Sequence, residues 1–206
     1  MRTREGARPA RHIGLSAFRL LSARDRVPRP WKNGGGVTRD IAVYPEGAGD
    51  ADFLWRASIA TIAAAGPFSA FPGIDRALML LDGELVVKIG EAAHRLRPGS
   101  AALHFVGEAT VSAAPVGESC TVLNIMARRG TYSATLDRWR AARATAANSL
   151  LLVAAGSAGI TVDQARFDLS ASDALFIDRP AGLSLSIDGP VIVAEIFHAA
   201  ADQFVQ

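Results

Sequence analysis

The chain has 206 residues, of which 50% are hydrophobic, a formal net charge of +2 and one cysteine. Its length and apolar content suffice for a globular protein with one large or two small cores. No run of about 18 uncharged apolar residues occurs, and Arg19 interrupts the apolar stretch 13–23, so we expect a cytoplasmic protein with neither a membrane span nor a secretory signal. A single cysteine excludes an intrachain disulfide, and the apolar surroundings of Cys120 predict a buried, inert thiol.

Positive charge is concentrated at the N-terminus. Residues 1–30 hold eight arginines against Glu5 and Asp25, a net charge of +6, so the remaining residues together carry −4. We therefore expect residues 1–14 to form a basic, disordered extension. The rest of the chain has no run of basic residues, so neither nucleic acid nor a membrane is expected as a partner.

Three consecutive glycines occupy the middle of the segment 31–40, WKNGGGVTRD. Glycine loses more entropy on folding than other residues, so such a run indicates a backbone that turns through positive φ or approaches another group closely. We interpret it as a binding loop in which backbone NH groups, Asn33 and Arg39 receive a small anion. A glycine-rich turn is the alternative. No Gly-Lys-Ser/Thr sequence closes the run, so a phosphate loop is not predicted.

After the glycine run, short segments rich in β-branched and aromatic residues are separated by turn-forming pairs, which indicates an all-β chain. In the first of these segments, strand alternation puts Arg39 in an otherwise apolar row with Ile41. Arg39 would then be ion-paired or line a pocket. In the segment 53–60, the even-numbered residues form a partly polar face that carries Arg56 and Ser58.

The chain also contains an internal repeat, which a shift of 73 positions reveals. This shift aligns Leu96 with Leu169 and matches the strand and turn patterns around them. The segment 120–127 has a counterpart in 191–197 at a slightly shorter offset, as a loop deletion would produce.

The repeat predicts two related β-barrels or sandwiches, over residues 15–130 and 131–206. Small barrels can hold one ligand inside or at the mouth. The segment 131–149 is ambiguous, because Tyr132 and Leu136 fit both helical spacing and strand alternation. We favour a strand there, since the second copy of the repeat needs one, with a short helix as the alternative.

These features resemble the HutD/Ves family. The resemblance rests on four motifs in a consistent order, which are WKNGGGVTR (31–39), FLWRASIA (53–60), GPFSAFPGIDR (66–76) and LNIM (123–126). It implies an all-β bicupin, that is, two tandem RmlC-like cupin β-barrels of the jelly-roll type. Members of the family are associated with histidine-utilisation gene clusters or stress-inducible genes, and a regulatory role through binding of a pathway metabolite has been proposed for them.

The chain departs from the family pattern at one position that matters chemically. The family usually carries an acidic residue two positions before Asn124, where this chain has Val122. Asp40 and Glu108 replace family residues of the same charge. The missing acid favours ligand binding over acid–base catalysis.

Neither a metal nor another cofactor is expected. Metal-binding cupins use a His-x-His pair with a later Glu and His, because residues two apart in a strand point to one face. No such spacing links the four histidines of this chain, which are His12, His94, His104 and His198.

We expect a ligand site in the N-terminal module and no catalytic residues. Guanidinium groups match carboxylates through two parallel hydrogen bonds, which makes arginines the main candidates. An amide in an apolar row, as at position 124, needs a backbone group or a ligand as its partner. The predicted ligand-binding residues are Trp31, Asn33, Gly34, Gly35, Thr38, Arg39, Arg56, Ser58, Ser69, Arg76 and Asn124.

The predicted function is metal-independent binding of a small carboxylate metabolite by a regulator of histidine utilisation. The resemblance points to urocanate or to a formylated or formiminated glutamate. One alternative is a metal-free hydrolase or isomerase that acts on such acids with Asp40, Asp75 or His104 as the base. Another is a protein-interaction module, and a homodimer is left open.

Overall fold

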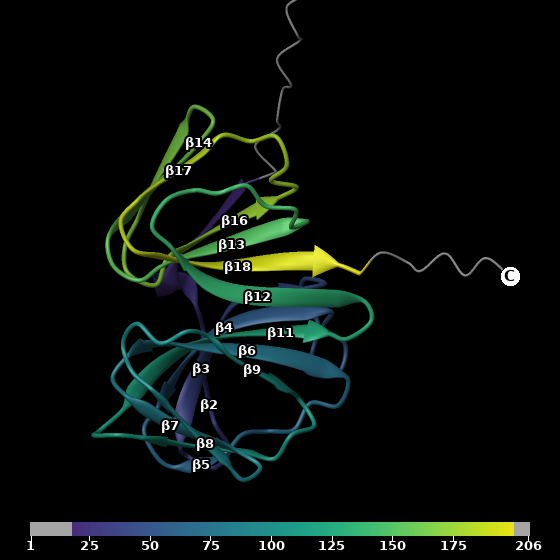
Figure 1. Ribbon diagram of the computed structural model, residues 1–206, viewed down its shortest axis with the longest axis vertical. Helices are drawn as coiled ribbons and strands as arrows, with labels where there is room; N and C mark the ends of the chain where they lie inside the picture. Colours follow the sequence, from purple (N-terminus) through teal and green to yellow (C-terminus); the bar gives the residue numbers. More distant parts are fainter. Residues whose placement is uncertain (1–17, 200–206) are drawn as a thin grey trace, which may run out of the picture.

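The computed structural model describes residues 18–199, which form antiparallel β-sheets apart from one short 3-10 helix, η2 (Ala23–Asp25) (Figure 1). The basic extension expected at residues 1–14 lies outside the described residues. Within the described part, no helix has the length and apolar character needed to cross a membrane.

The strands fall into two groups along the chain. The first group is β2 (Pro28–Pro30), β3 (Gly36–Tyr44), β4 (Trp55–Ile62), β5 (Gly66–Pro67), β6 (Ile74–Asp82), β7 (Leu85–Ile89), β8 (Ala92–Leu96), β9 (Leu103–Val106), β10 (Val111–Pro115) and β11 (Cys120–Arg128). The second is β12 (Tyr132–Trp139), β13 (Ser149–Ala154), β14 (Ala158–Val162), β15 (Ala165–Leu169), β16 (Ala174–Asp178), β17 (Leu185–Asp188) and β18 (Val191–His198).

Each group forms a larger and a smaller sheet. The first contains a six-stranded sheet of order β2-β3-β4-β11-β6-β9 and a four-stranded sheet of order β5-β10-β7-β8. The second contains a three-stranded sheet of order β15-β14-β17 and a five-stranded sheet of order β1-β16-β13-β18-β12, in which β1 is the N-terminal strand Phe18–Leu21. The fold is therefore the predicted all-β bicupin. The boundary between the modules at residue 130 stays a prediction, because β1 (Phe18–Leu21), from the first range, pairs with β16 in the second.

The internal repeat is confirmed by the strand positions. β7 and β14 begin at Leu85 and Ala158, and β8 and β15 begin 73 positions apart in the same way. The later strands β11 and β18 begin at Cys120 and Val191, which is the shorter offset that the sequence indicated. The strand favoured after residue 131 is also confirmed, because β12 pairs along its whole length with β18.

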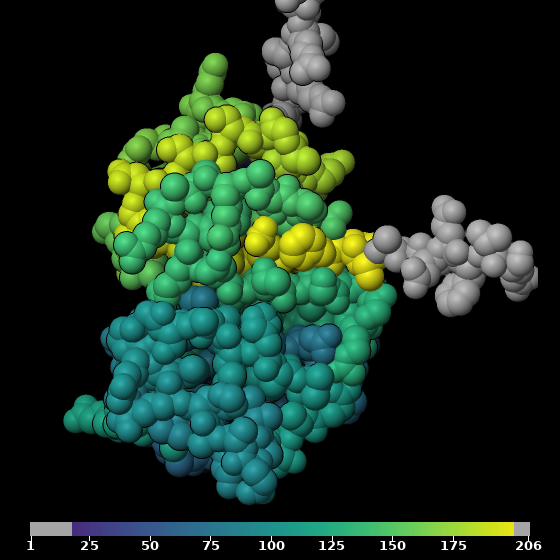
Figure 2. Space-filling view, viewed as in Figure 1, coloured from purple at the N-terminus to yellow at the C-terminus, as the bar shows by residue number. Residues whose placement is uncertain are grey.

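The two large sheets pack face to face, and their inner side chains form the core between the modules. This core contains residues of both halves of the chain, among them Ile59 and Leu123 from the six-stranded sheet and Leu151 and Ala194 from the five-stranded sheet. In Figure 1, β12 lies next to β4, β11 and β6, with β18 on its other side, and the space-filling view shows a continuous surface from one module to the other (Figure 2).

The smaller sheets close the two sandwiches differently. In the C-terminal module, the space between the sheets is filled with apolar side chains, including Trp139, Leu150 and Ile160. In the N-terminal module, an apolar cluster that includes Leu80 and Leu85 fills only part of the space. The remainder is a cavity, which is the candidate site.

Removing a large side chain from the core between the modules should destabilise the whole chain. Leu151 is fully buried, so Leu151→Ala is expected to lower the free energy of unfolding by about 3 kcal/mol in urea denaturation. Leu20→Ala is the matched control, because Leu20 is exposed and its loss is expected to change stability by no more than about 0.5 kcal/mol. Equal effects of the two substitutions would contradict the assignment of the core.

Candidate functional site

The candidate site is a cavity of about 740 Å³ on the face of the six-stranded sheet that is turned away from the core between the modules. Drug-sized and smaller ligands occupy cavities of about 300–1,000 Å³, so the size suits a small metabolite. The floor consists of even-numbered residues of β4, β6 and β11, because successive residues of a strand point to opposite faces. The segments 29–33 and 67–71 form the walls.

Two rows of side chains cross the floor. Asn124 of β11 lies opposite Ser58 of β4 and Leu78 of β6. In the next row, Met126 lies opposite Arg56 on one side and Arg76 on the other. Residues directly opposite in an antiparallel pair share a face, so these rows bring two guanidinium groups and one amide into the same cavity.

Arg76 is a buried cation without an acidic partner among the described residues. It is only 8% exposed, and its one hydrogen bond is from Nη1 to the carbonyl oxygen of Ser69 at 3.2 Å. The guanidinium lies over three aromatic rings, with its central carbon 4.9 Å from the ring centre of Phe105, 5.3 Å from that of Phe68 and 5.7 Å from that of Phe71. Its Nε is buried without a hydrogen-bond partner.

The surroundings of Arg76 disfavour its charged form. Burial, and secondarily the positive charge of Arg56, lower the pKa of Arg76 to about 10. The side chain is therefore still protonated at neutral pH, at a cost in free energy that an anion in the cavity would reduce.

Arg56 is equally buried but already neutralised. Its Nε donates to Oδ1 of Asp40 at 2.7 Å, and its Nη1 donates to Oδ1 of Asp50 at 2.8 Å. Asp40 also accepts a hydrogen bond from Arg29. The two arginines of the site thus differ sharply in how their charge is compensated.

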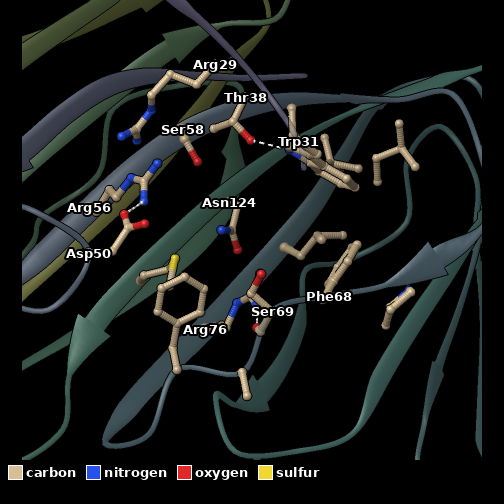
Figure 3. A pocket seen from close by; sticks show the side chains of 18 of the residues that line it. Arg29, Trp31, Thr38, Asp50, Arg56, Ser58, Phe68, Ser69, Arg76 and Asn124 are labelled. Carbon is tan, nitrogen blue, oxygen red and sulfur yellow. Dashed lines mark hydrogen bonds and ion pairs between the residues drawn. The ribbon is translucent and has the colours of Figure 1, made fainter. Parts of the chain in front are cut away.

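Asn124 supplies a polar group at the centre of the cavity. It is 8% exposed, and its Oδ1 is buried with no hydrogen-bond partner. Figure 3 shows its side chain in the middle of the site, with Arg56 and Asp50 to one side and Trp31 to the other. Buried amides without partners are rare in folded proteins, so this oxygen is available to a donor from a ligand or water.

The glycine run shapes the wall of the cavity rather than providing donors to it. Gly36 packs so closely that an added Cβ would lie 2.5 Å from the carbonyl oxygen of Thr61 and 3.2 Å from the ring of Trp31. Trp31 in turn donates from Nε1 to Oγ1 of Thr38 at 2.8 Å and packs edge to face on Phe68. The glycine therefore lets the tryptophan ring lie flat against the sheet.

The expectation that backbone NH groups of this run receive an anion is wrong. The NH of Gly34 donates to the carbonyl oxygen of Trp31 at 3.0 Å, and the NH of Gly35 donates to Oδ1 of Asn33 at 3.0 Å. Gly34 has a φ of 71°, which fits the turn reading of the run. Neither glycine lines the cavity.

The expectation for Arg39 is also wrong. Arg39 lies opposite Ile59, whose side chain belongs to the core between the modules, so Arg39 points away from the cavity. No ion pair involves Arg39 within residues 18–199. Ile41 shares this face with Arg39, because it belongs to the same core as Ile59, and the bulge between Asp40 and Ala42 breaks the predicted row only after Ile41.

The other eight predicted residues all line the cavity. They are Trp31, Asn33, Thr38, Arg56, Ser58, Ser69, Arg76 and Asn124. The structure adds residues that the sequence analysis did not assign to the site, which include Arg29, Asp50, Phe68 and Phe71. Val122, where the family usually has an acid, also lines the cavity, and it presents a methyl surface there.

None of the three candidate bases lines the cavity. Asp75 is paired with Arg129 at 2.7 Å, and Asp40 is held by two arginines. His104 lies on β9 opposite Ala77, on the other face of the sheet.

Cys120 is buried as expected, and burial raises the pKa of its thiol to about 11. Across residues 18–199, no three His, Cys, Asp or Glu side chains lie together as metal ligands would.

Two tandem antiparallel sandwiches, the first of which contains a large lined cavity, define this protein as a bicupin. The chain belongs to the HutD family, whose family model matches residues 23–194. HutD from Pseudomonas fluorescens SBW25 has a similar structure, with a TM-score of 0.79, 30% identity, and coverage of 89% of this chain and 100% of that one. A conserved protein of unknown function from Pseudomonas aeruginosa PAO1 is also similar, with a TM-score of 0.78 and 30% sequence identity. The match covers 87% of this chain and 98% of that one.

Curated relatives agree with this assignment. An uncharacterised 21.2 kDa protein in the hutC 3′ region of Pseudomonas putida is 35% identical over 147 residues, which are 69% of this chain and 76% of that protein. Protein Ves of Citrobacter koseri is 43% identical over 102 residues, 48% of this chain, and the match spans about half (52%) of its length. A cupin 2 conserved barrel domain protein from Leptotrichia buccalis shares the fold alone. Its TM-score is 0.52 and its sequence identity is 12%, and the match covers 79% of this chain and 88% of that one.

The close packing of Gly36 predicts a specific sensitivity. Gly36→Ala is expected to lower the free energy of unfolding by about 2 kcal/mol, because the new methyl group would overlap the Thr61 carbonyl and push the ring of Trp31. Gly49→Ala is the control, since a Cβ at Gly49 meets no atom within 4 Å. Thermal and urea unfolding would measure both, and a harmless Gly36→Ala would contradict the packing argument.

The uncompensated charge of Arg76 predicts a stability penalty. Because the folded-state pKa is lowered to about 10, well below the usual value for arginine, the penalty is fully present below pH 10 and is relieved only as the pH rises above 10. Arg76→Met is therefore expected to raise the free energy of unfolding at pH 7 by about 1 kcal/mol without added acids. Arg56→Met should instead destabilise the protein, because it leaves Asp40 and Asp50 unpaired. The opposite order of stabilities would contradict this electrostatic account.

Proposed function

We propose that the N-terminal module binds a small carboxylate, with Arg76 as the anchor of the anion. The observation that carries this proposal is a guanidinium that is buried, protonated and without an acidic partner among the described residues. A charge of this kind destabilises a protein unless a counter-ion joins it, so its presence favours a role in function. Arginine also has the fork of donors that fits a carboxylate.

The other lining groups suit an organic anion better than an inorganic one. Trp31 and Phe68 give the cavity an aromatic wall, while Ser58 and Asn124 place neutral hydrogen-bonding groups on the floor. A cavity with apolar walls and a few polar groups is typical of small-molecule sites. The ligand would therefore carry a carboxylate at one end and a partly apolar body with at least one polar group.

We further propose that the ligand comes from histidine breakdown and that binding serves regulation. The name of the family and the position of the Pseudomonas putida relative in the hutC 3′ region support this pathway. Urocanate and formylglutamate are the first candidates, since both combine a carboxylate with further polar groups. Binding is favoured over catalysis, because no candidate base lines the cavity and Val122 stands where an acid is usual.

Anion binding at Arg76 predicts a large effect of its removal. In calorimetric titration with urocanate and with formylglutamate, Arg76→Gln is expected to weaken binding about 10- to 100-fold, because a charge-assisted hydrogen-bond pair contributes about 1.5–3 kcal/mol. Arg39→Gln is the matched control on the opposite face of β3, with an expected change of no more than about twofold. If the folded wild-type protein binds no acid of the pathway, the ligand class is wrong.

A further inference from the structure

Asp50 places a carboxylate of the protein itself in the cavity where we propose that a ligand carboxylate binds. Its Oδ1 accepts from Nη1 of Arg56 at 2.8 Å, and this is its only side-chain hydrogen bond among residues 18–199. The side chain of Asp50 is 67% exposed, whereas that of Arg56 is 10% exposed. The pair therefore joins a fixed, buried cation to an anion that solvent surrounds on most sides (Figure 3).

The second acid on Arg56 is held in a different way. Asp40 belongs to strand β3, lies opposite Ser58 and is bound by Arg29 as well as Arg56. It does not line the cavity, whereas Asp50 does. Replacing Asp40 would break two ion pairs within a sheet, while replacing Asp50 would break one pair, whose carboxylate is mostly exposed.

The loop that carries Asp50 contacts the rest of the protein on both sides of this residue. Before Asp50, Glu46 pairs with Arg19 at 3.6 Å, and Ala48 packs against an apolar cluster that includes Phe53. After Asp50, Arg128 donates to the carbonyl oxygens of Ala51 and Phe53, and the Phe53 side chain is fully buried. Before Asp50 lies Gly49, where a side chain would meet nothing. A rotation of the Asp50 side chain is therefore sufficient to release Arg56, with no change in the sheet.

The two arginines are placed to act on one molecule. Arg56 and Arg76 lie on the two strands that flank β11, both opposite Met126, so their Cα atoms are about two strand spacings, or about 10 Å, apart. Both side chains face the same cavity. A short organic acid with a carboxylate at each end can therefore reach both guanidinium groups, provided that Asp50 leaves Arg56.

We propose that Asp50 is an exchangeable internal carboxylate that yields Arg56 to the second carboxylate of a dicarboxylate ligand, and so sets the preference of the site between mono- and dicarboxylates. The inference rests on the proposed anion binding at Arg76. A monocarboxylate bound at Arg76 leaves the Arg56–Asp50 pair intact. A dicarboxylate exchanges one carboxylate for another at Arg56, so Asp50 acts as its competitor.

The test compares two acids of equal carbon number, glutarate and pentanoate, by calorimetric titration at constant ionic strength. Asp50→Asn removes the competing charge, so it should strengthen glutarate binding about fivefold more than pentanoate binding. Asp52→Asn changes an exposed acid of the same loop that has no ion pair among residues 18–199, so it should alter neither affinity by more than about twofold. Asp50→Ser provides a second variant, and circular dichroism checks that each protein is folded.

The outcomes separate this inference from the proposed function. If Asp50→Asn and Asp50→Ser leave the glutarate-to-pentanoate ratio unchanged while both acids bind, carboxylate binding stands and the role of Asp50 is overturned. If no folded protein of the set binds either acid, the proposed function and this inference fail together. Adding Arg56→Gln to Asp50→Asn should abolish the gain, and a gain that persists without Arg56 would also overturn the exchange.

Discussion

The alternation of side chains along β11 is the constraint on which both the fold and the site depend. This strand lies between β4 and β6, and its odd-numbered residues, such as Leu123 and Ile125, enter the core between the modules. Its even-numbered residues, such as Asn124, therefore enter the cavity. The core between the modules and the cavity thus lie on opposite faces of the same strands, and a shift of one residue in register would exchange the side chains that enter them.

The two modules repeat the same strands but differ in the size of their cavities, which are about 740 Å³ in the first and about 200 Å³ in the second. The C-terminal module repeats the strands of the first but fills its interior with side chains such as Leu150, Leu152 and Val193. Its five-stranded sheet covers the face of the six-stranded sheet that is turned away from the cavity. Every residue of β4 except Thr61 is buried. A floor supported on its far side holds Arg56 and Arg76 in fixed positions, which is what recognition by paired hydrogen bonds requires. The second module therefore supports the sheet that forms the floor of the cavity, although none of its residues lines the cavity.

Much of the fold and part of the site could be predicted from the sequence, because they follow from periodicity. The repeat located β7, β8 and their counterparts, and alternation put Arg56 and Ser58 on one face. The remaining features depend on contacts that leave no local pattern. A bulge at β3 redirects its row, the NH groups of Gly34 and Gly35 are used by Trp31 and Asn33, and Asp50 sits in a loop whose path only the folded chain defines. The missing partner of Arg76 likewise becomes visible only when its whole surroundings are known.

The pairing of β1 with β16 limits when the first described strand can find its partner during folding. Phe18 lies opposite Ile177, so the first described strand has no partner until most of the chain has left the ribosome. Contacts between residues so far apart in sequence form slowly, because the closure of a long loop must precede them. β1 can therefore pair only after β16 has been synthesised. It also joins the two modules, because a fragment starting at β12 would leave the edge of β16 open to pairing with other chains.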